Sequence, residues 1–309
     1  MSNAPLHNLL DVPQDGNAMF VSAKDGTQIR VAYWQGGDRG TVLLFPGRTE
    51  YIEKYGRMVA KLQARDLNVV VIDWRGQGMS HRYDGRRDRG YVESFQDYQQ
   101  DIAAALNAPE VVALQGPRML FSHSMGGCIG LRALVDGLDV EAAVFSSPMW
   151  GLPGSAGAKF VLGAVNALGR PFGQHKALVP GTFPTYYAAV NPFEGNELTN
   201  DEDYYAMFQA HLKAEPDLGL GGPTIRWAAE AIKEMNTLMD ARAPDIPILT
   251  FAGTQEIIVD RDAIKSRALS LPNTRFEIIE DGKHEVWMET PKIQTQVWGI
   301  MDEFLGQIL

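Results

Sequence analysis

The residues that could do chemistry begin with a serine in the run SHSMGG, which covers residues 122–127. A serine hydroxyl is a poor nucleophile at neutral pH, so it needs a base, a group that orients the base, and N–H donors for the developing oxyanion. One known arrangement puts the serine on a sharp turn between a strand and a helix, with small residues two positions away on either side. Ser124 has Ser122 and Gly126 at those positions, between a strand pattern and a helical pattern. We therefore predict that Ser124 is the nucleophile, the alternative being an ordinary loop rich in serine and glycine.

The candidate base is His284, one of six histidines. It follows the last predicted strand, at the carboxyl edge of the predicted sheet, where functional loops gather. It also comes after Ser124 and after candidate acids, which is the chain order expected when the serine lies on such a turn. His123 adjoins the nucleophile, but the tight turn should point its side chain away.

The acid that orients the base should follow the preceding strand. Glu256 and Asp260 both lie in the loop after the strand pattern at residues 248–252 and qualify by type. Each could instead be a solvated loop charge, and Asp260 could cap the helix that is predicted to start near Arg261. Asp281 lies on the same loop as His284, where its side chain could stabilise the turn at Gly282.

The oxyanion needs two N–H donors. One should come from the residue after the nucleophile, Met125, and the other from the loop after the first central strand. That loop is PGRTE at residues 46–50, in which Gly47 allows the backbone to turn and Arg48 supplies the second N–H. The alternative is a plain Pro-Gly turn.

A second glycine-containing loop, DWRGQGMS, covers residues 73–80. Its spacing matches neither a dinucleotide fingerprint nor a phosphate-binding loop, which excludes nucleotide binding by these motifs. We predict that it supports the site structurally. No histidine and carboxylate cluster has the spacing typical of a metal site, so we expect neither a metal nor another cofactor.

The candidate nucleophile, acid and base follow three different strands, so the fold must bring the ends of these strands together. An alternating hairpin pattern around Asp25-Gly26 precedes a series of strand patterns separated by helical patterns. This alternation predicts an α/β fold with a mostly parallel central sheet covered by helices on both faces. The predicted strands are 19–22, 28–34, 41–45, 68–72, 118–121, 142–145, 248–252 and 275–279, and the predicted helices are 51–64, 95–105, 125–138, 261–271 and 291–309.

The alternation stops between residues 148 and 239, where the pattern is helical or irregular. A gap of about 90 residues is too long for a simple loop and predicts an inserted cap. We therefore predict a core of residues 16–147 and 240–309 with a cap at 148–239. An apolar stripe of Phe160, Val161, Ala164, Val165 and Leu168, followed by Tyr186, Tyr187 and Phe193, is expected to supply a few side chains to an acyl pocket that sets chain-length preference. The alternative is that this face only packs on the body, as part of it must.

Composition excludes several partners. The formal net charge of −10 argues against nucleic acids and anionic membranes as standing partners, because both select basic surfaces. No stretch has the length of a membrane span, and transient contact with lipid aggregates is compatible with the sequence. The single cysteine, Cys128, excludes an intrachain disulfide. Without a recognisable signal peptide, these features predict a cytoplasmic protein. The oligomeric state is not predicted.

Taken in order, the motifs resemble those of the monoacylglycerol lipase and bacterial lysophospholipase family of α/β-hydrolases, which are related to the S33 serine aminopeptidases. The resemblance covers nearly the whole chain beyond the first fifteen residues. The matching segments are 46–51, 73–80, 123–127, 221–224 with Trp227, and 284–289. Three positions depart from the family pattern: Pro46 replaces a histidine, Ser122 replaces a glycine, and Glu256 stands where the family has its catalytic aspartate.

The resemblance implies hydrolysis of an ester that carries one acyl chain, in a monoacylglycerol or a lysophospholipid. Ser124 would form an acyl-enzyme, His284 would be the base, Glu256 would orient it, and the N–H groups of Arg48 and Met125 would bind the oxyanion. Asp260 matches a second, non-catalytic aspartate. Two alternatives remain: a peptidase or amidase with the same triad, and a ligand-binding protein that has lost catalysis.

Overall fold

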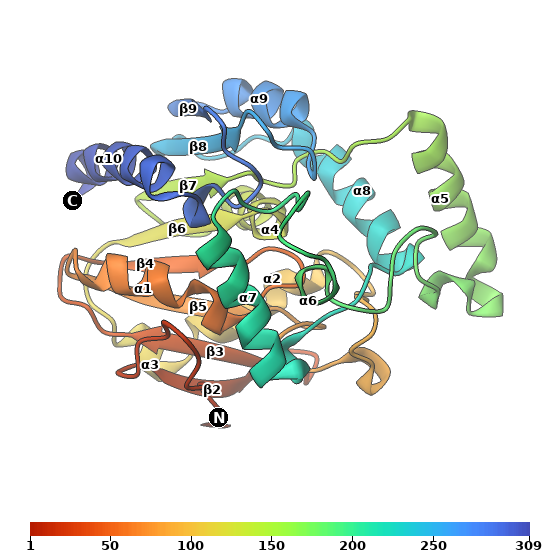
Figure 1. Ribbon diagram of the computed structural model, residues 1–309, viewed down its shortest axis with the longest axis horizontal. Helices are drawn as coiled ribbons and strands as arrows, with labels where there is room; N and C mark the ends of the chain where they lie inside the picture. Colours follow the sequence, from red (N-terminus) through yellow and green to blue (C-terminus); the bar gives the residue numbers. More distant parts are fainter.

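A single sheet of nine strands organises the computed structural model, which describes residues 1–309 (Figure 1). The strand order is β1-β2-β3-β5-β4-β6-β7-β8-β9. The first three strands join the sheet antiparallel, and every pairing from β5 to β9 is parallel. The strands are β1 (Ser2–Asn3), β2 (Asn17–Ser22), β3 (Gln28–Trp34), β4 (Gly40–Phe45), β5 (Leu67–Asp73), β6 (Arg118–His123), β7 (Ala142–Ser146), β8 (Ile248–Gly253) and β9 (Thr274–Ile279).

The central strands are buried along their whole length because helices cover both faces of the sheet. In β5, Val69 and Val71 pack into one apolar cluster, while Val70 and Ile72 pack into the other. This division follows from the alternation of side chains along a strand. The continuous apolar runs in the sequence are therefore the expected signature of strands buried on two sides.

The helices divide between these two clusters. Helices α1, α7 and α10 contribute to the cluster on one face, and α2, α4, α8 and α9 contribute to the cluster on the other. The predicted α/β fold is confirmed. The helices are α1 (Gly56–Gln63), α2 (Asp97–Leu106), α3 (Pro109–Val112), α4 (Met125–Val135), α5 (Ala156–Gly169), α6 (Tyr187–Val190), α7 (Glu202–Ala214), α8 (Ile225–Met239), α9 (Arg261–Ser270) and α10 (Pro291–Ile308).

One predicted helix is shorter than expected. The pattern after Ser124 predicted a helix through residue 138, but α4 ends at Val135. Gly137 has φ +96°, a backbone conformation that is incompatible with a continuing helix.

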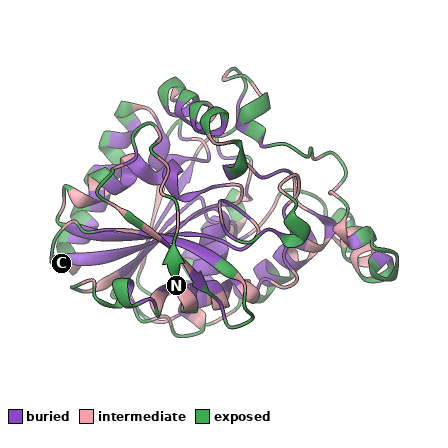
Figure 2. Ribbon diagram, turned by 90° about the horizontal axis from the view of Figure 1, so that it is seen from below, coloured by how far each residue is buried: buried purple, intermediate pink, exposed green.

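The segment between β7 and β8 contains α5 to α8 and no strand. Helix α5 packs against α8, which in turn contacts α4. Figure 1 shows α5 projecting from the side of the molecule, and Figure 2 shows that much of its surface is exposed. None of the helices combines the length and apolar composition needed to cross a membrane.

Candidate active site

Ser124 lies in the turn between β6 and α4, with φ 50° and ψ −117°. A non-glycine residue rarely adopts a positive φ, so the surrounding contacts must hold this conformation. The Ser124 N–H donates to the Ser146 carbonyl at 3.1 Å, and the Ser124 carbonyl accepts the Met149 N–H at 2.8 Å. Both contacts tie the turn to the end of the neighbouring strand β7.

The small residues around the turn are required by close approaches of the backbone. A Cβ atom at Gly126 would lie 2.1 Å from the Phe45 carbonyl oxygen, so only glycine fits there. Ser122 is fully buried, and its Oγ would lie 2.6 Å from a Cβ atom at Gly130. The serine in place of a glycine is accommodated because Gly130 has no side chain.

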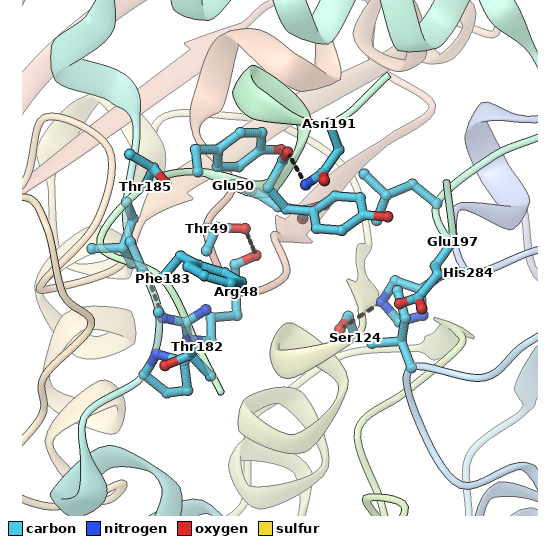
Figure 3. Close-up of a pocket in the computed structure, with 18 of the residues that line it drawn as sticks. Arg48, Thr49, Glu50, Ser124, Thr182, Phe183, Thr185, Asn191, Glu197 and His284 are labelled. Atoms are coloured by element: carbon cyan, nitrogen blue, oxygen red, sulfur yellow. Dashed lines mark hydrogen bonds between the residues drawn. The ribbon is translucent and has the colours of Figure 1, made fainter. Parts of the chain in front are cut away.

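The structure brings Ser124, His284 and Glu256 together from the ends of three strands. Nε2 of His284 lies 2.9 Å from Oγ of Ser124 (Figure 3). Nδ1 of His284 lies 2.6 Å from Oε2 of Glu256. All three residues are buried. The carboxylate selects the tautomer in which Nδ1–H donates to Glu256 and Nε2 accepts the serine proton.

Glu256 is held as an anion by its neighbours. Its second oxygen, Oε1, accepts the N–H groups of Ile258 at 2.7 Å and Val259 at 3.1 Å. Burial alone would raise the pKa of Glu256, but His284 and these N–H groups outweigh it and hold the pKa below its ordinary value. The charge that orients the imidazole is therefore present at neutral pH.

The two other acidic candidates occupy structural positions. Asp260 is the N-cap of α9, where its Oδ1 accepts the N–H groups of Asp262 and Ala263. Asp281 has φ 61° in the turn before His284 and is exposed. Of these three carboxylates, only Glu256 is hydrogen-bonded to His284.

The loop after β4 directs the Arg48 N–H through its neighbouring carbonyls. The Gly47 carbonyl accepts from Nε2 of Gln77 at 2.8 Å, and the Pro46 carbonyl accepts from Nε1 of Trp74 at 2.9 Å. Because a trans peptide points its C=O and N–H in opposite directions, holding the Gly47 carbonyl fixes the direction of the Arg48 N–H. That N–H has no acceptor within the protein.

The Met125 N–H is directed in the same way. The Ser124 carbonyl accepts N–H groups from Gly127 and Met149, both at 2.8 Å, which fixes the peptide that carries the Met125 N–H. As the first residue of α4, Met125 has no intrahelical acceptor for this N–H. The close approach of Gly126 to Phe45 brings the start of α4 against the end of β4, so the two predicted donors belong to adjoining segments.

The loop at residues 73–80 supports the loop after β4, in line with the structural role predicted from the sequence. Besides the Gln77 contact, Asp73 accepts the N–H groups of Ile52 and Met79, each at 2.8 Å. Asp73 also pairs with the buried Arg30 at 2.7 Å. These contacts fix the position of the loop.

A buried charge cluster lies beside His284. Nζ of Lys54 lies 2.5 Å from both Glu50 and Glu285, and Nε2 of His123 lies 3.3 Å from Glu285. The ring centroids of His123 and His284 are 4.8 Å apart. As expected, His123 points away from Ser124, and its Nδ1 lies 3.1 Å from the Ser146 carbonyl.

This cluster was not recognised in the sequence. Its only local signal is the spacing of four residues between Glu50 and Lys54, because Glu285 is distant in the chain. Glu50, His123 and Glu285 place possible ligand atoms within 4.8 Å of one another, but the Lys54 ammonium already bonds both carboxylates. The donor set is therefore that of an internal ion-pair network and does not fit a metal ion.

A cavity of about 510 Å³ opens over Ser124 and His284 (Figure 3). Its volume is in the range typical of small-molecule sites. Most of its apolar wall comes from the segment between β7 and β8 and from the loop after β8. The apolar side chains that line it are Met149, Leu152, Phe183, Tyr186, Tyr187, Val190, Leu198, Leu220, Trp227, Ile258 and Val259.

The prediction that the apolar stripe on α5 contributes to an acyl pocket is wrong. Phe160, Val161 and Leu168 are exposed, and no residue of α5 lines the cavity. Helical spacing correctly indicated an apolar face on α5, but the helix projects from the body and much of that face lies in solvent. Tyr186 and Tyr187 do line the cavity, whereas Phe193 packs against Tyr205 instead.

The sheet order, the turn between β6 and α4, and the loops at the ends of β8 and β9 define the class of protein. It is an α/β-hydrolase. Solved structures with the same fold include a monoglyceride lipase from Saccharomyces cerevisiae, with a TM-score of 0.72 and 17% identity over 98% of this chain and 100% of that one. A carboxyl esterase from Bacillus coagulans has a TM-score of 0.75 and 16% identity over 96% and 99% of the two chains.

The family model described as serine aminopeptidase, S33, matches residues 36–291. The lysophospholipase L2 of Escherichia coli strain K12 is 30% identical over 279 residues, which cover 86% of this chain and 80% of that protein. A probable lysophospholipase L2 of Haemophilus influenzae is 28% identical over 87% and 84% of the two chains. The chain therefore belongs to the S33 family of α/β-hydrolases, and its enzyme class is that of the carboxylic ester hydrolases.

Proposed function

We propose that this protein hydrolyses the carboxylic ester of lipids with a single acyl chain, a monoacylglycerol or a lysophospholipid, through an acyl-enzyme on Ser124. The observation that carries the proposal is the continuous hydrogen-bonded series Ser124, His284 and Glu256 beneath a cavity with an apolar wall. The relatives named as lysophospholipases support the substrate class.

In the first half of the reaction, Ser124 Oγ attacks the ester carbonyl while His284 Nε2 takes the hydroxyl proton. The Arg48 and Met125 N–H groups stabilise the oxyanion, and Glu256 stabilises the imidazolium. The imidazolium then donates its proton to the leaving glycerol oxygen as the carbonyl–oxygen bond breaks. In the second half, His284 deprotonates a water molecule, which attacks the acyl-enzyme and releases the fatty acid and the serine hydroxyl.

We also propose that residues 148–239 form the cap that covers this cavity. Phe183, Tyr186 and Val190 come from this segment and support that role, since they supply cavity wall above the catalytic residues. A cytoplasmic location is part of the same proposal, and the one cysteine, the buried Cys128, supports it.

The test compares Ser124→Ala with Ser122→Ala on p-nitrophenyl octanoate. Ser124→Ala should abolish turnover and keep the melting temperature, while Ser122→Ala should keep most of the turnover. A fluorophosphonate should label Ser124 in the wild type, as mapped by mass spectrometry. A label on Ser122, or full turnover by Ser124→Ala, would overturn the proposal.

The peptidase alternative is tested with aminoacyl p-nitroanilides under the same conditions. We expect their kcat/KM to be far below that of the ester, because Glu50 and Glu285, two neighbouring carboxylates in the cavity wall, are already bonded to Lys54 and are not free to bind an amino terminus. A higher kcat/KM for the anilide would favour the activity that gives the S33 family its name.

A further inference from the structure

The side chain of Arg48 is a cation in the cavity wall without an acidic partner. Its Nη2 donates to the Gly221 carbonyl at 2.6 Å, and its guanidinium lies 5.1 Å from the centroid of the Trp227 ring. No carboxylate lies within 4.0 Å of it. Burial lowers the pKa of Arg48 to about 10, so the side chain remains charged at neutral pH.

The donors of this guanidinium are mostly unused. Nε is buried and has no hydrogen-bond partner. Nη1 also has no partner within the protein, but it is not enclosed. Arginine offers five N–H donors in a fixed plane that matches phosphate and carboxylate oxygens. The contacts with Gly221 and Trp227 therefore position the group, and Nη1 remains free to donate to a ligand in the cavity.

The other charged groups around the cavity either form ion pairs with one another or lie on the side away from Arg48. Lys54, the second cation in the wall, is paired with both Glu50 and Glu285. Glu197 is exposed, and Figure 3 shows it on the His284 side of the cavity, whereas Arg48 is on the side of Thr182 and Phe183. Because a desolvated charge is costly without a partner, the missing counter-charge of Arg48 is expected from the substrate.

We propose that the Arg48 guanidinium binds the phosphate of a lysophospholipid and makes the enzyme prefer phosphate-bearing glycerol esters to uncharged ones. This inference rests on the proposed function, in which the Arg48 N–H binds the ester carbonyl oxygen. The path from that nitrogen to Cζ contains as many covalent bonds as the path from the ester carbonyl carbon through glycerol to phosphorus. A substrate that lies along the Arg48 side chain therefore places its ester carbonyl at the Arg48 N–H and its phosphate at the guanidinium.

The first experiment measures kcat/KM for a 1-acyl lysophosphatidylglycerol and for the 1-monoacylglycerol with the same chain, both below their critical micelle concentrations. Arg48→Gln should lower the ratio of the two values roughly ten- to a hundredfold, and Arg48→Lys should lower it less because the charge remains. Arg65→Gln is the matched control, because it removes a positive charge that pairs with Asp302 outside the cavity. A ratio that Arg48→Gln leaves unchanged would overturn the proposal.

The second experiment measures binding without turnover. In a Ser124→Ala background, the dissociation constants of a 1-O-alkyl lysophospholipid and the matching 1-O-alkylglycerol are compared with and without Arg48→Gln. Only the phosphate-bearing ether should lose affinity, by a factor similar to the kinetic one. Inorganic phosphate is the control for a free anion: Arg48-dependent binding of phosphate as tight as that of the ether lipid would overturn the assignment to a lipid headgroup.

The two proposals fail in different ways. If the proposed function is wrong, the wild type hydrolyses neither ester, or Ser124→Ala hydrolyses both, while the binding comparison still reports on Arg48. If only the role of Arg48 is wrong, both esters are hydrolysed in a Ser124-dependent manner and their ratio does not respond to Arg48→Gln.

Discussion

Glu256 and His284 share a hydrogen bond of 2.6 Å between Oε2 and Nδ1, although the glutamate stands where related enzymes are expected to carry an aspartate. The longer side chain also reaches two backbone N–H groups of its own loop, those of Ile258 and Val259. The carboxylate is therefore fixed from both sides, by the imidazole and by the loop that follows β8.

Glu256→Gln should lower kcat by at least about a hundredfold, because a neutral amide neither selects the imidazole tautomer nor stabilises the imidazolium. Glu256→Asp should be less impaired, since the charge remains but its reach is shorter. Asp260→Asn should keep near wild-type kcat, as asparagine also caps helices. Turnover of p-nitrophenyl octanoate measures all three, and loss of activity in Asp260→Asn with retention in Glu256→Gln would show that the acid is misassigned.

Gly126→Ala should damage both the turn and the oxyanion loop. Its Cβ would lie 2.1 Å from the Phe45 carbonyl and 2.6 Å from the Pro46 carbonyl, so the loop that carries Arg48 must move. We expect at least a roughly tenfold loss of kcat and a destabilisation of about 1–3 kcal/mol.

The matched control for Gly126→Ala is Gly299→Ala in α10, where an added Cβ meets nothing within 4 Å. It should leave kcat unchanged and stabilise the helix by up to about 1 kcal/mol. Equal effects of the two substitutions on kcat would contradict the role assigned to the contact between Gly126 and β4.

His123 makes folding stability depend on pH. Burial opposes its charge, but Glu285 and Glu50 outweigh burial and raise the pKa of His123 above its ordinary value of 6.5. The stabilisation is complete below about pH 6.5 and is lost as the pH rises through the higher pKa of the folded state. The free energy of unfolding of the wild type, from urea denaturation, should therefore fall above pH 6.5 relative to that of His123→Gln. Parallel pH profiles for the two proteins would exclude this contribution.

Chain-length preference should depend on the cavity wall and not on α5. Phe183 lines the cavity and Phe160 does not, yet they are similarly exposed, at 70% and 77%. Phe183→Ala should lower the ratio of kcat/KM for p-nitrophenyl decanoate over butyrate by roughly three- to tenfold, since it removes apolar contacts with the longer chain. Phe160→Ala should leave this ratio unchanged with monomeric substrates. If only Phe160→Ala changed this ratio, the acyl chain would bind at α5 and the prediction would be wrong.

The sequence predicted best those features that depend on a short stretch of chain, namely the central strands and the motifs at their ends. The central strands were predicted to within one or two residues because apolar runs buried on both faces have few alternative conformations. Ser124 and His284 could be proposed because each lies in a short motif at the end of a strand. The Lys54 and Glu285 pair could not be predicted, because only the folded sheet brings the two residues together.

The error on α5 has a different cause. Periodicity shows that one face of a helix is apolar, but it does not show what that face contacts. Part of the apolar face of α5 packs against α8, and the remainder is exposed to solvent. The helical spacing of its apolar residues therefore did not show whether they line a pocket.

The segment before α7 is bonded to the loop of His284, although it lies within the insertion. The Leu198 carbonyl accepts the Glu285 N–H at 2.8 Å, and Oγ1 of Thr199 donates to the Met288 carbonyl at 2.7 Å. Asn200 donates to Glu289, which also receives the N–H of Lys283. The insertion is therefore not a module that could be exchanged whole between relatives. A chimaera that replaces residues 148–239 would also replace the residues that hold the His284 loop in place, whereas one that retains residues 196–200 would keep those contacts.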